Sequence, residues 1–254
     1  MRNSITKACQ WILLSLNLFK ISIGPSLFIA MTYLLIYLIV PAMPSTQFLT
    51  PFTILVWPFI TVFILYFYFC VSTNKVFEIS DGLKVISKNP RGLFLMTIAS
   101  TAYAMLMGFL VSGDIENILL ILQKPEVRQF QANHFLYLLL KLTLLGVPFY
   151  MAAWFSPLLI ACHNYGFIKA LKSSFAGALM YIMPLFFSWV GLTVIFIGLV
   201  MLITFLLTSL TFISMTMVSF FTSLLLLLLL ASFVAIMFCL QFISFIAIFK
   251  KFSC

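Results

Sequence analysis

Few side chains in this sequence could take part in acid–base, nucleophilic or metal chemistry. Of the 254 residues, five are Asp or Glu and two are His. An enzyme needs groups that exchange protons, attack a substrate or bind a metal ion. No G-x-S-x-G or S-x-x-K sequence frames a serine as a nucleophile, and no glycine-rich loop could hold a phosphate. We therefore expect neither enzymatic activity nor a cofactor.

The histidines and carboxylates are also poorly spaced for a metal site. His134 and His163 fall at opposite ends of one predicted helix, which would separate them by about 40 Å. Asp114 and Glu116 could pair near a surface, but a solvated loop is the simpler interpretation. All five carboxylates are predicted to lie in loops: Glu78, Asp81, Asp114, Glu116 and Glu126. We expect no metal ligand among these residues.

One apolar segment combines a glycine, two prolines and a tryptophan in a way typical of an interrupted helix. Gly146 and Pro148 precede Trp154, and Pro157 follows it. Interrupted helices line the solute sites of many transporters, although prolines are also common where a helix bends to pack. If the protein has a path for a solute, we expect it along this segment.

Transport that is coupled to protons or sodium commonly needs a carboxylate inside the helical bundle. No Asp or Glu falls in a predicted span of this chain, and Lys141 is the only charged residue that does. Lys141 lies about two turns from the outer end of its span, so its long side chain can extend to water. Any transport is therefore expected to be independent of ions.

The composition indicates that membrane helices position these residues. Hydrophobic residues make up 64% of the chain and charged residues 7%, whereas a soluble domain has about 25% charged residues. A bilayer accepts apolar side chains on the outside of a protein, and water does not. The net charge of +9 is explained by basic cytoplasmic loops, which are typical of membrane proteins. Nucleic-acid binding is not indicated, because no basic run is interleaved with aromatic residues. The expected partner is the lipid bilayer.

Six continuous apolar runs predict an all-α integral membrane fold, with residues 1–254 forming one domain. A helix needs about 20 apolar residues to cross a bilayer, and its backbone groups must bond internally there. Residues 173–249 carry no charge and could hold two tilted spans or three short ones. We choose two, because two spans keep Lys250 and Lys251 in the cytoplasm. The six predicted spans cover residues 23–40, 51–71, 92–111, 135–160, 182–206 and 222–248.

The distribution of Lys and Arg predicts that both chain termini lie in the cytoplasm. Eleven of the 14 basic residues then lie in cytoplasmic segments, whereas Lys124 and Arg128 lie outside. The cytoplasmic residues are Arg2, Lys7, Lys20, Lys75, Lys84, Lys88, Arg91, Lys169, Lys172, Lys250 and Lys251. We expect a basic cytoplasmic surface that is formed by Lys84, Lys88, Arg91, Lys169 and Lys172.

The first, third and fifth spans are each preceded by an amphipathic segment and opened by a proline. The segments cover residues 8–20, 76–86 and 167–178, and the prolines are Pro25, Pro90 and Pro184. Apolar residues at helical spacing give each segment one apolar face, which suits a helix at the cytoplasmic membrane surface. The pattern favours three helical hairpins, each introduced by such a helix, although proline is common in any first helical turn.

Small residues at four-residue spacing predict where helices approach closely. One stripe is formed by Ser100, Ala104 and Gly108 in the third span. The other is formed by Ala231 and Ala235 in the sixth. Each stripe could pack against another span of this chain or against a membrane-protein partner.

Three short motifs carry a resemblance to a known family. They are Trp154-Phe155-Ser156-Pro157, Ala170-Leu171-Lys172-Ser173-Ser174-Phe175 and Pro184. The chain resembles an uncharacterised family of bacterial multi-pass inner-membrane proteins with a W-F-x-P … A-x-K-x-S-F … P signature. That family is distantly similar to the membrane domain beside some glycerophosphodiester phosphodiesterases. The resemblance implies a fold and a place in the inner membrane, but no activity.

The scarcity of titratable groups in the spans decides the expected function. We expect a non-enzymatic membrane protein with a structural, accessory or interaction role beside other membrane proteins. The alternative is a permease or channel-like protein for a small or lipidic solute, not coupled to ions. Solute flux that is lost on changing Pro148 or Trp154 would favour the alternative.

Overall fold

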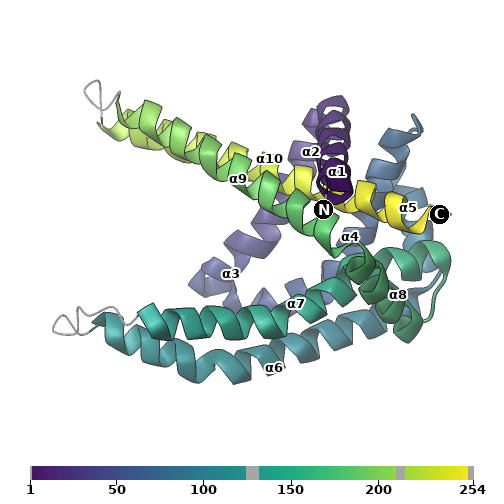
Figure 1. The fold of residues 1–254 in the computed structure, drawn as a ribbon, viewed down its shortest axis with the longest axis horizontal. Coiled ribbons are helices and arrows are strands. Elements are labelled where there is room, and N and C mark those ends of the chain that lie inside the picture. The colour runs from purple at the N-terminus through teal and green to yellow at the C-terminus, as the bar shows by residue number, and fades with distance from the viewer. Residues whose placement is uncertain (1, 124–131, 210–214, 251–254) are drawn as a thin grey trace.

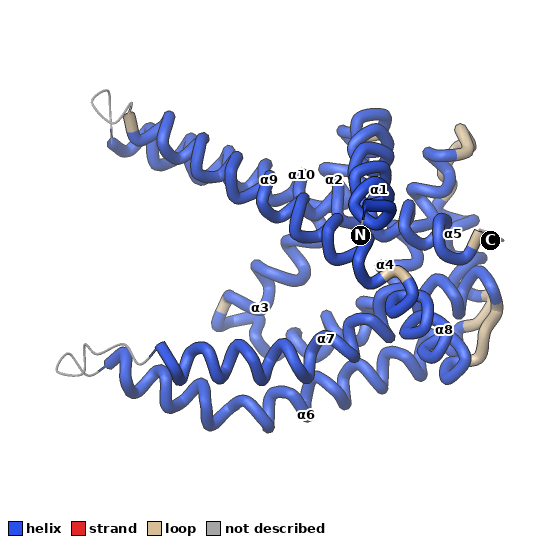
Figure 2. The backbone as a smooth tube through the Cα atoms, in the orientation of Figure 1, coloured by secondary structure: helices blue, strands red, loops and turns tan. Residues whose placement is uncertain are grey.

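The computed structural model describes residues 2–123, 132–209 and 215–250, and the regular elements of these ranges are all helices (Figure 2). The prediction of an all-α fold is therefore confirmed. Lys124, Glu126, Arg128 and Lys251 lie outside the described residues. The α-helices are α1 (Arg2–Ile21), α2 (Ile23–Leu34), α3 (Val40–Ala42), α4 (Thr50–Ser72), α5 (Ile79–Ser87), α6 (Pro90–Gln123), α7 (Ala132–His163), α8 (Phe167–Met180), α9 (Ile182–Thr208) and α10 (Met215–Phe249). A π-helical segment (Leu35–Ile39) follows α2, and a 3-10 helix (Pro44–Leu49) precedes α4.

Six helical segments are long and apolar enough to cross a membrane, by length and composition. They are Ile23–Ala42, Phe52–Ser72, Pro90–Glu116, Leu136–His163, Ile182–Leu207 and Ser219–Phe249. Each coincides with one predicted span, and the uncharged block near the C-terminus holds two of them. The connection between these two, predicted at residues 208–219, falls partly outside the described residues.

The third apolar segment corrects the prediction that all carboxylates lie in loops. The helix α6 does not end near residue 111, so Asp114 and Glu116 are helical residues. Asp81 also lies in a helix, α5. The prediction failed because a single glycine such as Gly113 costs a helix only about 1 kcal/mol, and Leu and Ile residues on both sides continue the helix.

An amphipathic helix followed by two apolar segments occurs three times along the chain. The amphipathic helices are α1, α5 and α8. The helix after each one has a proline among its first three residues: Pro25 in α2, Pro90 in α6 and Pro184 in α9. Proline suits a first helical turn because its missing N–H would have no partner inside the helix there.

The long helices form two pairs that diverge from each other. The helix α6 packs along α7, and α9 packs along α10. Figure 1 shows that the two pairs separate toward the left of the view, with α3 between them. The helix α2 instead packs against α10, where Ala30 and Leu34 lie against Ala231 and Ala235.

The best-packed part of the molecule lies where α4, α7 and α10 meet, near α5 and α8. The largest buried side chains there include Leu65, Tyr68, Phe155, Phe242 and Phe245. The helix α8 packs along α7, and α1 packs against α9 and α10. This core fixes one end of both diverging pairs, so any space between the pairs must open toward their other ends.

Candidate functional site

A side chain from α8 binds the backbone of α7. The helix contains Pro148 and Pro157, whose missing N–H groups leave two carbonyls without their helical donors. The hydroxyl of Ser174 donates to the Met151 carbonyl at 2.9 Å and accepts from the Phe155 N–H at 3.1 Å. In a regular α-helix these two backbone groups bond to each other. Ser174 therefore binds both backbone partners of one turn of α7.

Two further side chains bind backbone carbonyls of α7, one within this bridge and one before it. Gln241 of α10 donates from Nε2 to the Trp154 carbonyl at 2.6 Å. The Tyr103 hydroxyl of α6 donates to the Leu145 carbonyl. A carbonyl oxygen has two lone pairs, so each of these carbonyls can accept a side-chain donor in addition to its helical bond. The helices α6, α8 and α10 thus converge on the segment of α7 that contains Trp154.

A cavity of about 490 Å³ lies against this segment and forms the candidate site. Its walls come from α2, the π-helical segment, α4, α6, α7 and α10. The lining is mainly aromatic and includes Tyr33, Trp57, Tyr103, Phe149, Tyr150 and Trp154. Cavities of this size and composition are typical sites for small apolar molecules.

Three residues that line this first cavity each carry a buried polar atom that has no hydrogen-bond partner in the described part of the chain. These atoms are the Tyr37 hydroxyl, the Ser100 hydroxyl and Nε1 of Trp154. A buried polar atom without a partner costs about 1–3 kcal/mol. A ligand with its own polar atoms would remove that cost. Tyr37 also lies in the π-helical segment, a rare element that is frequent at functional sites.

A second cavity, also of about 490 Å³, lies between α7 and the α8–α9 segment. Tyr150 and Trp154 line both cavities. Together with Trp189 of α9 they form an aromatic cluster, in which the ring centroids are 5.0–5.2 Å apart. Edge-to-face contacts hold such rings together, and Trp189 makes them with both partners. Nε1 of Trp189 is likewise buried without a partner among the described residues.

Only two of the four residues predicted to form a solute path line these cavities. Trp154 lines both of them, and Gly146 lines the second. Pro148 is exposed and Pro157 is buried, and neither is among the lining residues. The two prolines therefore shape α7 and do not contact a molecule in either cavity.

The two predicted stripes of small residues have different surroundings. Ser100 and Ala104 line the first cavity, and a side-chain carbon added at Gly108 would meet nothing within 4 Å. These residues of α6 leave space open. Ala231 and Ala235 are fully buried against α2.

Lys141 forms a partly exposed ion pair, a contact that the prediction of a side chain extending to water did not include. Its Nζ lies 2.6 Å from Oδ2 of Asp114 and also donates to the Leu110 carbonyl at 2.7 Å. The reason is the continuation of α6, which carries Asp114 to the level of Lys141 on the adjacent helix α7. Neither charged residue lines a cavity.

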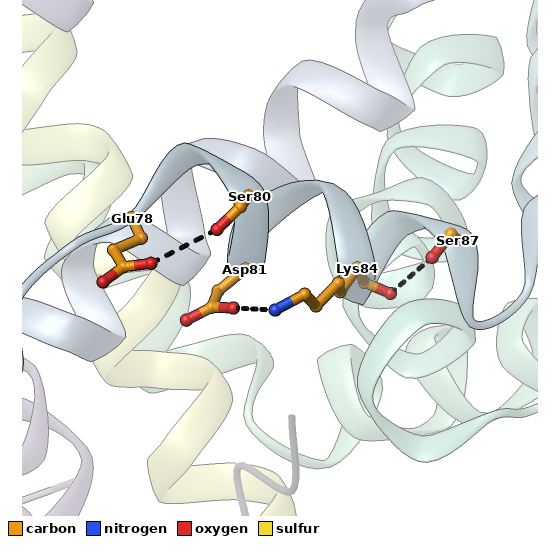
Figure 3. A network of polar contacts seen from close by, with 5 residues as sticks. All are labelled: Glu78, Ser80, Asp81, Lys84 and Ser87. Carbon is orange, nitrogen blue, oxygen red and sulfur yellow. Dashed lines mark hydrogen bonds and ion pairs between the residues drawn. The ribbon is translucent and has the colours of Figure 1, made fainter.

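The helix α5 carries a small network of exposed polar contacts (Figure 3). Lys84 binds Asp81 at 2.7 Å, and the Ser80 hydroxyl lies 3.3 Å from Glu78. Ser87 donates to the backbone carbonyl of Lys84 at 2.9 Å. The Asp81 carboxylate raises the pKa of Lys84 through this hydrogen bond. Lys84 therefore stays positively charged at neutral pH.

The remaining residues of the predicted basic surface lie near the same end of the molecule. Lys88 directly follows α5, Arg91 lies in the first turn of α6, and Lys169 and Lys172 lie in α8. All four residues are exposed. Asn89 donates to the Tyr165 carbonyl at 3.2 Å, which links the start of α6 to the segment before α8. Nζ of Lys169 lies 4.2 Å from the centroid of the Tyr165 ring. The hydrogen bond therefore connects the start of α6, which carries Arg91, to the segment that leads into α8, which carries Lys169 and Lys172.

Sequence reasoning missed most of the cavity lining. Tyr33 and Tyr37 stack at 4.3 Å, and Tyr150 contacts Trp154 at 5.2 Å. Both pairs are four residues apart in a span, a spacing that places the two rings on the same helix face. This four-residue spacing could have identified both pairs of rings from the sequence. No sequence signal joined Trp189 to them, because it belongs to a different helix.

Neither a metal-binding cluster nor a similarity to known proteins assigns a function to this chain. Among the described residues, no group of three or more His, Cys, Asp or Glu side chains could hold a metal ion. Family models, curated proteins and solved structures gave no match to this chain. The resemblance to a bacterial inner-membrane family therefore stays a prediction, and the cavities are the main guide to function.

Proposed function

We propose that this chain is a multi-pass membrane protein that binds an uncharged, largely apolar solute in the first cavity and lets it permeate without coupling to ions. One observation carries the proposal: a cavity within apolar helices is lined by residues whose buried polar atoms have no partner in the described residues. A bundle with a purely structural role would be expected to fill this space with side chains.

The chemistry of the lining favours an uncharged solute. Both cavities are lined, over the described residues, by aromatic, aliphatic and a few neutral polar side chains. Moving a charge into such surroundings costs far more free energy than moving a hydrocarbon or an aromatic ring. The hydroxyls of Tyr37 and Ser100 can each donate and accept, so they suit a hydroxyl or carbonyl group on the solute.

The position of the charged residues favours permeation that is independent of ions. A carboxylate that couples flux to ions faces the solute path and changes its charge there. Asp114 lines neither cavity and is paired with Lys141 at 2.6 Å. Its role is therefore expected to be structural.

The proposed location is a bacterial inner membrane, with both termini in the cytoplasm and α1, α5 and α8 at the cytoplasmic surface. Each of these helices would then introduce a hairpin of two spans. The faces of α1 support this placement: Trp11 and Leu18 are buried, whereas Leu13 and Leu16 on another side are exposed. Acyl chains can cover such exposed leucines at the headgroup boundary, and anionic lipids would meet the basic residues of α5 and α8.

The proposal is tested by flux of a fluorescent diacylglycerol across proteoliposomes that contain the purified protein. Ala104→Phe should reduce the rate at least fivefold, because the added ring fills the first cavity. Gly108→Phe is the matched control, because it adds the same ring to the same helix where a side chain meets open space. Its rate should equal that of the unchanged protein.

Two results would overturn this proposal. One is flux through the unchanged protein that equals flux through protein-free liposomes. The other is an equal loss in both variants, which would attribute the effect to damage of α6 and not to the cavity. In either case a structural or interaction role beside other membrane proteins becomes the better explanation.

A further inference from the structure

The two cavities lie on opposite sides of one aromatic wall. Tyr150 and Trp154 line both cavities, and Trp189 packs on both of these rings. A rotation of these side chains would therefore join two spaces of about 490 Å³ each. This inference rests on the proposed function and concerns how the solute reaches its site.

The second cavity faces the outside of the bundle. Most of its large apolar lining residues are exposed, among them Leu139, Leu142, Val147, Ile182 and Phe186. The cavity lies between α7 and α9, which belong to the two pairs that diverge in Figure 1. In a bilayer, acyl chains cover exposed apolar side chains at this depth. An acyl chain is therefore the occupant that this cavity fits.

The residues of the wall between the cavities carry two indole donors, which are buried in this conformation, and no charge. Nε1 of Trp154 and Nε1 of Trp189 are both buried without a partner among the described residues. An indole N–H can only donate a hydrogen bond, so its partner must be an acceptor. A bare hydrocarbon has no acceptor, and a charged headgroup would find no counter-ion in the lining. An ester carbonyl at the end of an acyl chain meets both conditions.

We infer that the second cavity is a lateral entrance for an uncharged acyl ester, whose carbonyl oxygen accepts a hydrogen bond from the indoles of Trp154 and Trp189. The acyl chain enters between α7 and α9. The cluster of Tyr150, Trp154 and Trp189 then moves aside to admit the ester to the first cavity. The hydrogen bond compensates the loss of water or headgroup contacts by the carbonyl at that point.

The inference is tested by quenching of tryptophan fluorescence in detergent micelles with a diacylglycerol brominated on its acyl chains. The protein has four tryptophans. Variants that keep only Trp189 report on the second cavity, and variants that keep only Trp57 report on the first. A variant with Phe109→Trp as its only tryptophan measures quenching by the surrounding micelle, because Phe109 is exposed on α6 and lines neither cavity. Trp57 and Trp189 should both be quenched at a lipid fraction that leaves this exposed tryptophan unaffected.

The role of the donors is tested by the matched ether lipid, which has the same brominated chains but no carbonyl. In the unchanged protein the ester should bind about fivefold more tightly than the ether, as expected for one hydrogen bond to a buried donor. The double change Trp154→Phe and Trp189→Phe keeps the rings and removes both donors. It should bring the ester and the ether to equal affinity.

Each contrary result has a separate meaning. Quenching of Trp57 without quenching of Trp189 would overturn the lateral entrance and leave the proposed function in place. Equal affinity of ester and ether for the unchanged protein would overturn the role of the indoles. Absence of quenching at Trp57 would overturn the proposed function and this inference with it.

Discussion

Nζ of Lys141 in α7 lies 2.6 Å from Oδ2 of Asp114 in α6. Both side chains are about a quarter exposed, at 26% and 28%, so water screens the pair only in part. Lys141→Met leaves the Asp114 charge without its partner and should lower the free energy of unfolding by a small, salt-dependent amount. Thermal unfolding in detergent at fixed lipid content measures this.

The exchanged pair is the control for this ion pair. Asp114→Lys combined with Lys141→Asp restores an attractive contact and should recover most of the lost stability. Cavity binding should be unchanged in all of these variants, because neither residue lines a cavity. A variant that keeps full stability but loses solute binding would contradict this assignment.

The hydroxyl of Ser174 is expected to be essential for the packing of α8 on α7. Ser174→Ala leaves the Phe155 N–H and the Met151 carbonyl without the bridge, so the free energy of unfolding should fall by about 1–3 kcal/mol. Ser232→Ala is the control, because that hydroxyl is exposed and bonds only to the Leu228 carbonyl of its own helix. Equal effects of the two changes in chemical denaturation would show that the bridge contributes nothing.

Two glycines of α6 should respond differently to alanine. A side-chain carbon at Gly92 would lie 2.8 Å from Cγ2 of Ile160, so Gly92→Ala should destabilise the protein by about 1–3 kcal/mol through overpacking. Gly108 has open space, so Gly108→Ala should be neutral or stabilise by up to about 1 kcal/mol through helix propensity. Thermal unfolding of both variants in one detergent measures these changes in stability. A Gly92→Ala variant that is more stable than the unchanged protein would show that α6 and α7 are not tightly packed at Gly92.

The orientation in the membrane predicts the location of reporters fused along the chain. Fusions after Thr46 and Ser209 should report an external location, and fusions after Lys84 and Cys254 a cytoplasmic one. The physical reason is the concentration of Lys and Arg in the segments assigned to the cytoplasm. An external C-terminus would contradict the even number of spans.

The spans themselves could be predicted because they depend on local properties of the chain. A helix in a bilayer satisfies its own backbone hydrogen bonds, so length and hydropathy of one segment are sufficient to identify it. The amphipathic helices before Pro25, Pro90 and Pro184 were predictable for the same reason. The boundary of α6 was missed because the charged residues Asp114 and Glu116 resemble a loop when the partner of Asp114 on α7 is unknown.

By itself, the sequence determined a helical chain with six apolar segments, two of them in the uncharged block, and singled out Trp154. Only the tertiary structure decided which helices meet. Gln241 binds the Trp154 carbonyl across 87 residues, Trp189 joins the aromatic cluster from another helix, and Lys141 is paired with Asp114. Hydropathy cannot encode such contacts, because in lipid every apolar helix face is acceptable to the solvent and neighbours are selected by shape and hydrogen bonding.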